Sequence, residues 1–301
     1  MSGRTAAARR WATRGLGWAR QALETGRERL ADGARTAAFL GETLKFEPRP
    51  TDVFVVTYPR SGTTWMQFLV YLLVSDRRLE FEHISQVCPW YERSLALGTR
   101  TAEDFARLTS PRIFKSHLRP EWVPSPARII YVERDGLDVL VSYFHFYRSH
   151  LGFQGAFDEF YERFMEGTLQ YRSWFDHVQA WRRAEGRRSV LWIRYEDMKQ
   201  QPESTIERVA EYLGRPVDAE SRAQIASMVA YDFMKAHETK FDPITEHLID
   251  RRFMPGSFIR SGESGVGKAR LDARQIERFE TRQRKPRKIA IPERRIADFL
   301  H

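Results

Sequence analysis

A run of small, hydroxyl-bearing and basic residues follows an apolar stretch at residues 57–65, with the sequence Thr-Tyr-Pro-Arg-Ser-Gly-Thr-Thr-Trp. The apolar run Val53–Val56 precedes it, and an apolar-periodic stretch that ends near Val74 follows it. A strand, a tight turn and a helix in this order aim backbone N–H groups and the positive end of a helix dipole at an anion. Gly62 permits the turn, and Arg60 adds a permanent cation. The pattern therefore predicts a phosphate-binding loop with donors from Arg60, Ser61, Gly62, Thr63 and Thr64.

This loop departs from the nucleotide-binding Walker pattern, because it has no second glycine upstream and no Lys after Gly62. The string TYPRSGTTW instead closely resembles the TYPKSGTTW loop of the cytosolic sulfotransferases, which holds the 5′-phosphosulfate of 3′-phosphoadenosine 5′-phosphosulfate (PAPS). Residues 130–148 resemble a second family string, YVxRNxKDVxVSYYHFYR, whose Arg and Ser grip the 3′-phosphate. The resemblance spans roughly residues 45–285.

The resemblance implies a set of residues that bind the PAPS donor. Arg134 and Ser142 map onto the 3′-phosphate site, and Tyr195, in a string similar to the family's YEDM, maps onto an adenine contact. Aromatic faces at Trp65 and Phe233 are expected to flank the base. A further glycine-rich segment resembles the RKGxxGxxK segment that closes over the 3′-phosphate, with Ser in the Lys position, and contributes Arg260, Ser261 and Gly262.

The resemblance also implies a general base and two catalytic cations. His117, just after a predicted strand, matches the family's KTHL or KSHL segment, whose His takes the proton of the acceptor. Imidazole suits this role because its ordinary pKa of about 6.5 leaves it largely neutral at pH 7. Lys115 and Arg60 are the cations expected at the sulfuryl group and its leaving phosphate. Arg60 stands where most members have Lys, and an Arg is a poor proton donor.

By the same resemblance, the acceptor is expected to lie against Trp90, Phe146 and Tyr147. Their aromatic character indicates a small, hydrophobic acceptor with a hydroxyl or amine group. Arg93 lies close to Trp90 in the sequence, and it either meets a negatively charged acceptor or faces water.

The elements that must position these residues alternate along the chain. Strands are predicted at 53–57, 111–116, 128–133 and 189–195. Helices are predicted from the loop to Val74 and at 102–108, 135–148, 157–166, 168–184, 203–212, 219–228 and 272–283, with an irregular stretch at 241–267. This order predicts an α/β fold, with a central parallel sheet flanked by helices on both faces, similar to the P-loop NTPase-like fold of sulfotransferases. The predicted parts are a basic helical extension (1–45), a sulfotransferase domain (46–290) and a C-terminal tail (291–301).

Charge and cysteine content limit the partners and the compartment. The net charge of +9 arises from +5 in residues 1–45 and +6 in residues 268–301, which leaves −2 for the rest and disfavours a nucleic-acid partner. One cysteine, Cys88, excludes an internal disulfide and suits the cytoplasm. No apolar run reaches the length of a membrane span. The Arg-rich residues 1–42 permit a weak membrane-surface contact, and the alternative is a solvated or core-packed extension.

Two other functions stay open at the level of sequence. A P-loop phosphotransferase or kinase would need a Lys after the loop glycine and acidic Mg²⁺ ligands. The other is a catalytically inactive, sulfotransferase-like binding protein. The presence of all four residues His117, Lys115, Arg134 and Ser142 argues against this loss of activity. The leading hypothesis is a PAPS-dependent sulfotransferase that requires no metal, and its oligomeric state is open.

Overall fold

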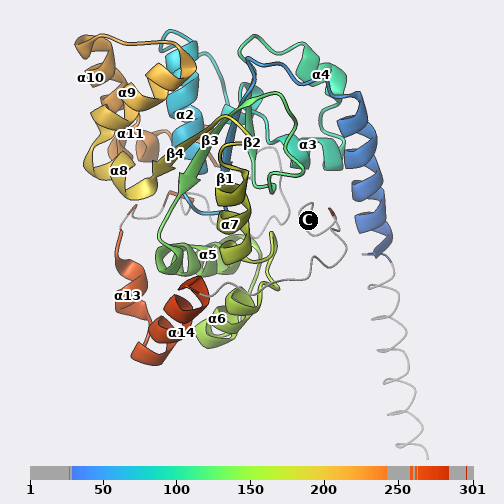
Figure 1. Ribbon diagram of the computed structural model, residues 1–301, viewed down its shortest axis with the longest axis vertical. Helices are drawn as coiled ribbons and strands as arrows, with labels where there is room; N and C mark the ends of the chain where they lie inside the picture. Colours follow the sequence, from blue (N-terminus) through green and yellow to red (C-terminus); the bar gives the residue numbers. More distant parts are fainter. Residues whose placement is uncertain are drawn as a thin grey trace, which may run out of the picture.

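The computed structural model describes residues 27, 29–242, 258–259, 262, 264–284 and 296. Figure 1 shows a central sheet with helices packed around it. Of the predicted site residues, Arg260 and Ser261 lie outside the described residues, as do positions 1–26 of the predicted membrane-surface segment.

The sheet consists of four parallel strands in the order β2-β1-β3-β4. Their bounds are Val53–Thr57 for β1, Ile113–Ser116 for β2, Arg128–Glu133 for β3 and Val190–Arg194 for β4. All four carboxyl ends therefore lie at one edge, where ligands bind in open α/β sheets. The loop after β1, His117 after β2 and Arg134 after β3 all emerge at this edge.

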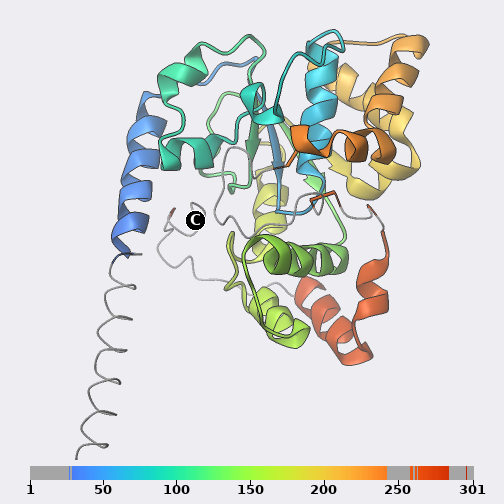
Figure 2. The same cartoon turned by 180° about the vertical axis from the view of Figure 1, so that it is seen from behind.

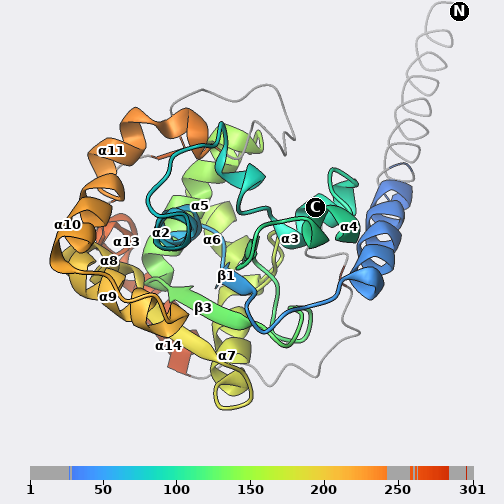
Figure 3. The ribbon, with the colours of Figure 1, turned by 90° about the horizontal axis from the view of Figure 1, so that it is seen from above.

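Side chains that alternate along the strands build one hydrophobic core on each face of the sheet. In β1, Phe54 and Val56 belong to the first core, and Val53 and Val55 belong to the second. Figure 3 shows the helices on both sides of the sheet. The predicted fold class, a parallel sheet flanked by helices on both faces, is confirmed.

Helices cover both faces and the sheet edges. The second core packs against α2 (Thr63–Val74), α9 (Pro202–Leu213), α10 (Ala219–Met228) and α11 (Tyr231–Ala236). The first core packs against α3 (Tyr91–Leu97), α4 (Ala102–Ala106), α5 (Gly136–His150), α6 (Phe157–Glu166), α7 (Trp174–Ala184), α13 (Val266–Arg270) and α14 (Ala273–Arg284). The short α8 (Tyr195–Gln200) follows β4, and the 3-10 turns are η1 (Ile84–Gln86) and η2 (Glu238–Lys240).

Element boundaries differ from the sequence prediction at the start of α7 and at the end of β4. Helix α7 begins at Trp174 rather than at residue 168, because Tyr171 and Arg172 adopt positive φ angles of 65° and 61°. The hydroxyl of Ser173 then accepts a hydrogen bond from the Asp176 N–H and caps the helix. Tyr195 is the first residue of α8, whereas the prediction placed it in the strand.

Further differences concern short helices. Residues 91–97, for which no element is predicted, form helix α3, and α13 (266–270) begins inside the predicted irregular stretch, 241–267, and continues past its end. The segments are five to seven residues long, too short for a clear helical period.

The described part of the N-terminal extension is a helix over 29–45 that stands beside α3 and α4 (Figure 1). Phe39 and Phe46 are buried, and each ring meets the ring of Tyr91 edge to face, at centroid distances of 6.1 and 5.1 Å. This contact braces α3, which begins one residue after Trp90. In the part of the chain that the structure describes, no helix combines the length and apolarity needed to cross a membrane.

Candidate active site

The turn between β1 and α2 has the shape expected of a phosphate-binding loop. Gly62 is the N-cap of α2 with φ 90°, and a Cβ at this position would lie 2.6 Å from the Tyr195 ring. Both conditions exclude a larger residue. The Ser61 hydroxyl is buried, and it has no hydrogen-bond partner within the described residues. A buried donor of this kind at a helix N-terminus suits a phosphate oxygen.

Arg60 joins this loop to α5. Its backbone has φ 67°, its Nε donates to Ser142 Oγ at 3.3 Å, and its Nη2 donates to the Phe258 carbonyl at 3.2 Å. The guanidinium lies 5.0 Å from the ring centroids of both Phe146 and Phe258. The aromatic faces hold the cation in a partly dehydrated position, where it interacts strongly with an anion.

The two residues predicted for the 3′-phosphate lie on either side of Arg60. Arg134 Nη1 donates to the Arg60 carbonyl at 3.0 Å, and the Arg134 guanidinium lies 4.4 Å from the centroid of the Tyr195 ring. Ser142 meets the Arg60 side chain from α5. The structure therefore brings Arg60, Arg134, Ser142 and Tyr195 together, although they come from four separate segments.

The other residues predicted for the donor lie around the same edge of the sheet. A Cβ on Gly262, which has φ 62°, would lie 3.4 Å from the Tyr231 ring and 3.9 Å from Tyr195 Oη. Phe233 stacks on His237, with centroids 4.3 Å apart. Thr63 is buried, while Thr64 and Trp65 are partly exposed on the first turn of α2.

His117 is buried at the carboxyl end of β2, and its neighbours determine its tautomer. Nδ1 lies 2.8 Å from the Thr57 carbonyl oxygen, which can only accept, so Nδ1 carries the proton. Nε2 is then left with a lone pair. Burial, and secondly the charge of Lys115, lower the His117 pKa well below its ordinary value. The imidazole is thus neutral at pH 7 and able to accept a proton.

Lys115 is two residues before His117 and faces the same aromatic side chain. Its Nζ lies 3.6 Å from the ring centroid of Trp90, and its backbone N–H donates to the Pro89 carbonyl at 2.9 Å. Desolvation lowers the Lys115 pKa to about 7, Glu92 opposes this shift, and Arg60 and Arg93 add to it. A cluster of cations in which one ammonium has a lowered pKa is suited to an anionic ligand, because the anion stabilises the charged form.

Glu92 is a site residue that the sequence prediction missed. Its fully buried carboxylate accepts two hydrogen bonds at Oε1, from Trp90 Nε1 and from the His117 N–H, each at 2.7 Å. Burial raises the Glu92 pKa, while these two donors oppose the rise. The carboxylate thus fixes Trp90 and His117 relative to each other. The position of Glu92 two residues after Trp90 was the available sequence signal.

Tyr171 is the second missed residue. Its ring meets the His117 ring edge to face at 5.1 Å and is stacked on Trp90 at 6.3 Å. Trp90 itself meets His117 edge to face at 5.2 Å. Tyr171 has a positive φ of 65° in the turn before α7, and no local sequence pattern predicts this turn or the contact with His117.

The other two predicted acceptor residues are placed differently. Phe146 is partly exposed, next to Arg60, and is stacked on His150 at 4.3 Å. Tyr147 is buried between α5 and α6, and its hydroxyl accepts the Gln170 N–H at 2.9 Å. It thus supports the turn that carries Tyr171. Arg93, whose environment the sequence left open, is buried, with its guanidinium 5.5 Å from the Trp90 ring.

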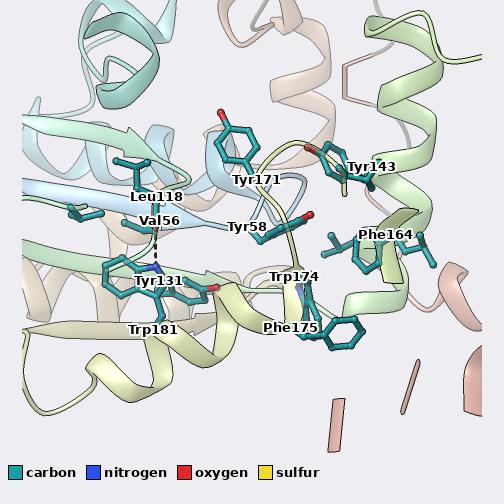
Figure 4. Packing of buried hydrophobic residues seen from close by; sticks show 14 of the residues in the cluster. Val56, Tyr58, Leu118, Tyr131, Tyr143, Phe164, Tyr171, Trp174, Phe175 and Trp181 are labelled. Atoms are coloured by element: carbon teal, nitrogen blue, oxygen red, sulfur yellow. Dashed lines mark hydrogen bonds between the residues drawn. The ribbon is translucent and has the colours of Figure 1, made fainter. Parts of the chain in front are cut away.

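Helix α7 holds the segment that carries His117 in place. His177 Nε2 donates to the His117 carbonyl at 3.0 Å, and burial lowers the His177 pKa to about 3. Trp181 Nε1 donates to the Leu118 carbonyl at 3.1 Å, and Figure 4 shows this bond within the aromatic core. Both groups are neutral donors, so the support of His117 does not change with pH near neutrality. Across the described residues, no group of three or more His, Cys, Asp or Glu side chains could hold a metal ion.

Comparison with known proteins gives the same family throughout. Residues 50–288 match the Sulfotransferase domain. Sulfotransferase 2B1 of Mus musculus is 34% identical over 244 residues, which cover 77% of this chain and 70% of that protein. Sulfotransferase 1C2 of Homo sapiens is 30% identical over 249 residues, which cover 78% and 82%.

Solved structures share the fold over most of the chain. Mouse sulfotransferase SULT7A1, complexed with PAP, superposes with a TM-score of 0.64 at 26% identity and covers 83% of this chain and 88% of its own. A retinol dehydratase, complexed with retinol and PAP, superposes with a TM-score of 0.69 at 24% identity and covers 84% and 88%. The domain match and the curated relatives show that this chain belongs to the sulfotransferase family, and the predicted enzyme class is confirmed.

Proposed function

We propose that this enzyme transfers the sulfuryl group of PAPS to a hydroxyl or amine of a small acceptor, with His117 as the general base. The observation that carries this proposal is the tautomer of His117. Its Nδ1–H donates to the carbonyl of Thr57, the residue at which the phosphate loop begins. Nε2 is therefore the ring nitrogen that can accept a proton, close to Lys115 in the sequence. The predicted co-substrate PAPS agrees with the PAP complex of the related SULT7A1.

The reaction is a displacement at sulfur. His117 Nε2 takes the proton of the acceptor hydroxyl, the oxygen forms a bond to sulfur, and the bond from sulfur to the phosphate oxygen breaks. The electron pair of that bond leaves with the product nucleotide, 3′-phosphoadenosine 5′-phosphate (PAP). Catalysis then depends on positioning and on cations beside the developing negative charge.

Arg60 and Lys115 divide the electrostatic work. Arg60 is held by Ser142, Phe146 and Phe258 and remains charged at all relevant pH values, so it stabilises charge without donating a proton. Lys115 has a pKa of about 7 in the free enzyme. Binding of the anionic donor raises that pKa, so that the ammonium is fully protonated in the complex. It is the better candidate to give a proton or a hydrogen bond to the leaving phosphate.

The acceptor is expected to be a small molecule with a hydrophobic body. Trp90 and Tyr171 present aromatic faces at the side of His117, and Phe146 presents another beside Arg60. Such faces suit apolar rings and chains. We further propose a reducing compartment, the cytoplasm, for this enzyme, since its single thiol, Cys88, is buried with a raised pKa.

The proposal is tested by incubation with [³⁵S]PAPS and a panel of phenols, sterols, fatty alcohols and sugars. Label is expected in a product made with a phenol, sterol or fatty alcohol, and His117→Ala should abolish it while His145→Ala, on the exposed side of α5, should not. Transfer that continues at the wild-type rate in His117→Ala would contradict the assigned base.

A further inference from the structure

Several described residues between Phe258 and Gly267 contact helices and loops that carry residues of the proposed donor site. The Phe258 carbonyl accepts from Arg60, and the backbone of Gly262 lies near Tyr231 and Tyr195. Further contacts fix Ile259 on one side of Gly262 and Gly265 and Gly267 on the other. The side chains that make them are Asp138, Lys235 and Glu238, none of which is among the predicted site residues.

Asp138 fixes the downstream side. Its Oδ2 accepts the Gly265 N–H at 2.7 Å and its Oδ1 accepts the Gly267 N–H at 2.8 Å, so one buried carboxylate binds two backbone donors. Asp138 lies in the first turn of α5, four residues before Ser142, and the two side chains therefore share a face of that helix. The face that holds the glycine segment is thus the face that meets Arg60.

The close approach of the chain reinforces this contact. A Cβ on Gly267 would lie 2.4 Å from the Leu137 carbonyl carbon and 2.7 Å from the Asp138 backbone nitrogen. Backbone atoms cannot move aside as a flexible side chain can, so any larger residue at position 267 would push α13 away from α5. Figure 2 shows α13 alongside α5 and next to α14.

Lys235 and Glu238 fix the upstream side. Glu238 Oε1 accepts the Ile259 N–H at 2.5 Å, and Lys235 Nζ donates to the Ile259 carbonyl at 2.6 Å. The same ammonium lies 2.9 Å from Glu238 Oε2. One ion pair thus satisfies both backbone groups of a single residue. The helix that supplies Lys235 also supplies Phe233 and Tyr231, which lie at the predicted adenine side.

We propose that Asp138 and the Lys235–Glu238 pair are positioning residues for the PAPS donor, which fix both flanks of Gly262 relative to α5 and α11. None of the three needs to touch PAPS. They lower the cost of ordering the backbone when PAPS binds, because the N–H and carbonyl of Ile259 and the N–H groups of Gly265 and Gly267 are already held. The inference rests on the donor site proposed above.

The test compares charge-removing variants of nearly equal shape. In Asp138→Asn one terminal atom becomes an N–H₂ group, which cannot accept from glycine. In Glu238→Gln the ion pair loses its charge, and in Lys235→Met the donor is lost while the chain length is kept. The matched controls are Asp218→Asn and Glu207→Gln. In the wild type, Asp218 caps α10 and Glu207 pairs with Arg222 on the surface. PAP binding is measured by calorimetry for each purified full-length variant.

Asp138→Asn, Glu238→Gln and Lys235→Met should each weaken PAP binding about 10-fold or more, since each removes a hydrogen bond that involves a charged group. The KM for PAPS should rise by the same factor while kcat at saturation changes less. Lys235→Arg should retain the PAP binding that Lys235→Met loses, because Arg keeps the positive charge and the N–H donors. Gly267→Ala should show the same rise in KM by the steric route. The two controls should bind PAP as the wild type does.

Three results have distinct meanings. Weaker PAP binding in the three variants and not in the controls supports the positioning role. Wild-type PAP binding in the three variants overturns it, even if their melting temperatures fall, and leaves the proposed donor site intact. Absence of PAP binding by the wild-type enzyme overturns the donor site and this inference together.

Discussion

The carboxylate of Glu92 accepts a hydrogen bond from the backbone N–H of His117, with Oε1 and N 2.7 Å apart. The same oxygen accepts from Trp90 Nε1, so one buried acid places His117 and the Trp90 ring relative to each other. His177 holds the carbonyl of His117 from α7. His117 is therefore fixed at its N–H, its carbonyl and its Nδ1, which leaves Nε2 for the proposed role of general base.

Removal of the imidazole should stop chemistry and spare donor binding. We expect His117→Ala to lower kcat by about 10²- to 10⁴-fold, the usual contribution of general base catalysis. The Kd for PAP should stay close to the wild-type value, because the predicted donor contacts lie in other residues. Single-turnover rates and calorimetry on the same preparation separate the two effects. A matching loss of PAP affinity would show that the substitution damaged the donor site as well.

PAP binding should take up a proton above pH 7. Lys115 has a pKa of about 7 in the free enzyme, so at pH 8 it is mostly neutral, and bound phosphates raise that pKa. Affinity for PAP should therefore fall as pH rises above 7, by up to about 10-fold per pH unit until the pKa of the complex is reached. Calorimetry in buffers of different ionisation enthalpy measures the uptake.

Lys115→Arg provides the control for this prediction. A guanidinium stays charged across the range, so the variant should bind PAP with little proton uptake and a flatter pH dependence. Equal proton uptake in the variant and the wild type would assign the titration to another group and contradict the role given to Lys115.

Glu92→Gln should change the pH dependence more than the structure. Gln keeps an oxygen for the Trp90 and His117 donors, but it removes the negative charge that supports the Lys115 ammonium. We expect the Lys115 pKa to fall below about 7 and the decline of PAP affinity to begin at a lower pH. Glu103→Gln, on the surface of α4, is the control. An unshifted pH profile would mean that Glu92 acts on His117 and Trp90 alone.

Arg60 should tolerate Lys better than Ala. Arg60→Lys keeps the cation and loses the fork that reaches Ser142 and Phe258, so we expect a loss in kcat/KM of about 10-fold at most. Arg60→Ala removes the charge that we propose stabilises the leaving phosphate, with an expected loss of about 100-fold or more. Arg107→Ala, an exposed residue, controls for the loss of a basic side chain. A fully active Arg60→Ala enzyme would rule out the assigned donor loop.

Contiguous strings carried most of what the sequence could predict. The loop at 57–65, the segment with Lys115 and His117 and the run from Arg134 to Ser142 are each set by local order, and the parallel sheet brings their ends to one edge. The four strands and the long helices were recognisable for the same reason. Their hydrophobic periods are clear over ten or more residues or over a buried apolar run.

The sequence could not reveal contacts that exist only after folding. Glu92 acts through its burial and through donors from Trp90 and His117, and Tyr171 reaches His117 because a turn with positive φ angles ends before α7. Asp138 resembles an ordinary acid near a helix start until Gly265 and Gly267 are seen to bind it. Arg93 likewise shows its buried position only in the folded chain.

The most direct test of the central claim is a calorimetric titration of the wild-type enzyme with PAP and, in parallel, with ADP. PAP carries the 3′-phosphate for which Arg134 and Ser142 are assigned, and ADP does not. We expect tight binding of PAP without added metal and at least about 100-fold weaker binding of ADP, and Arg134→Ala should remove most of that difference. Equal affinities, or a preference for ADP that depends on Mg²⁺, would contradict it.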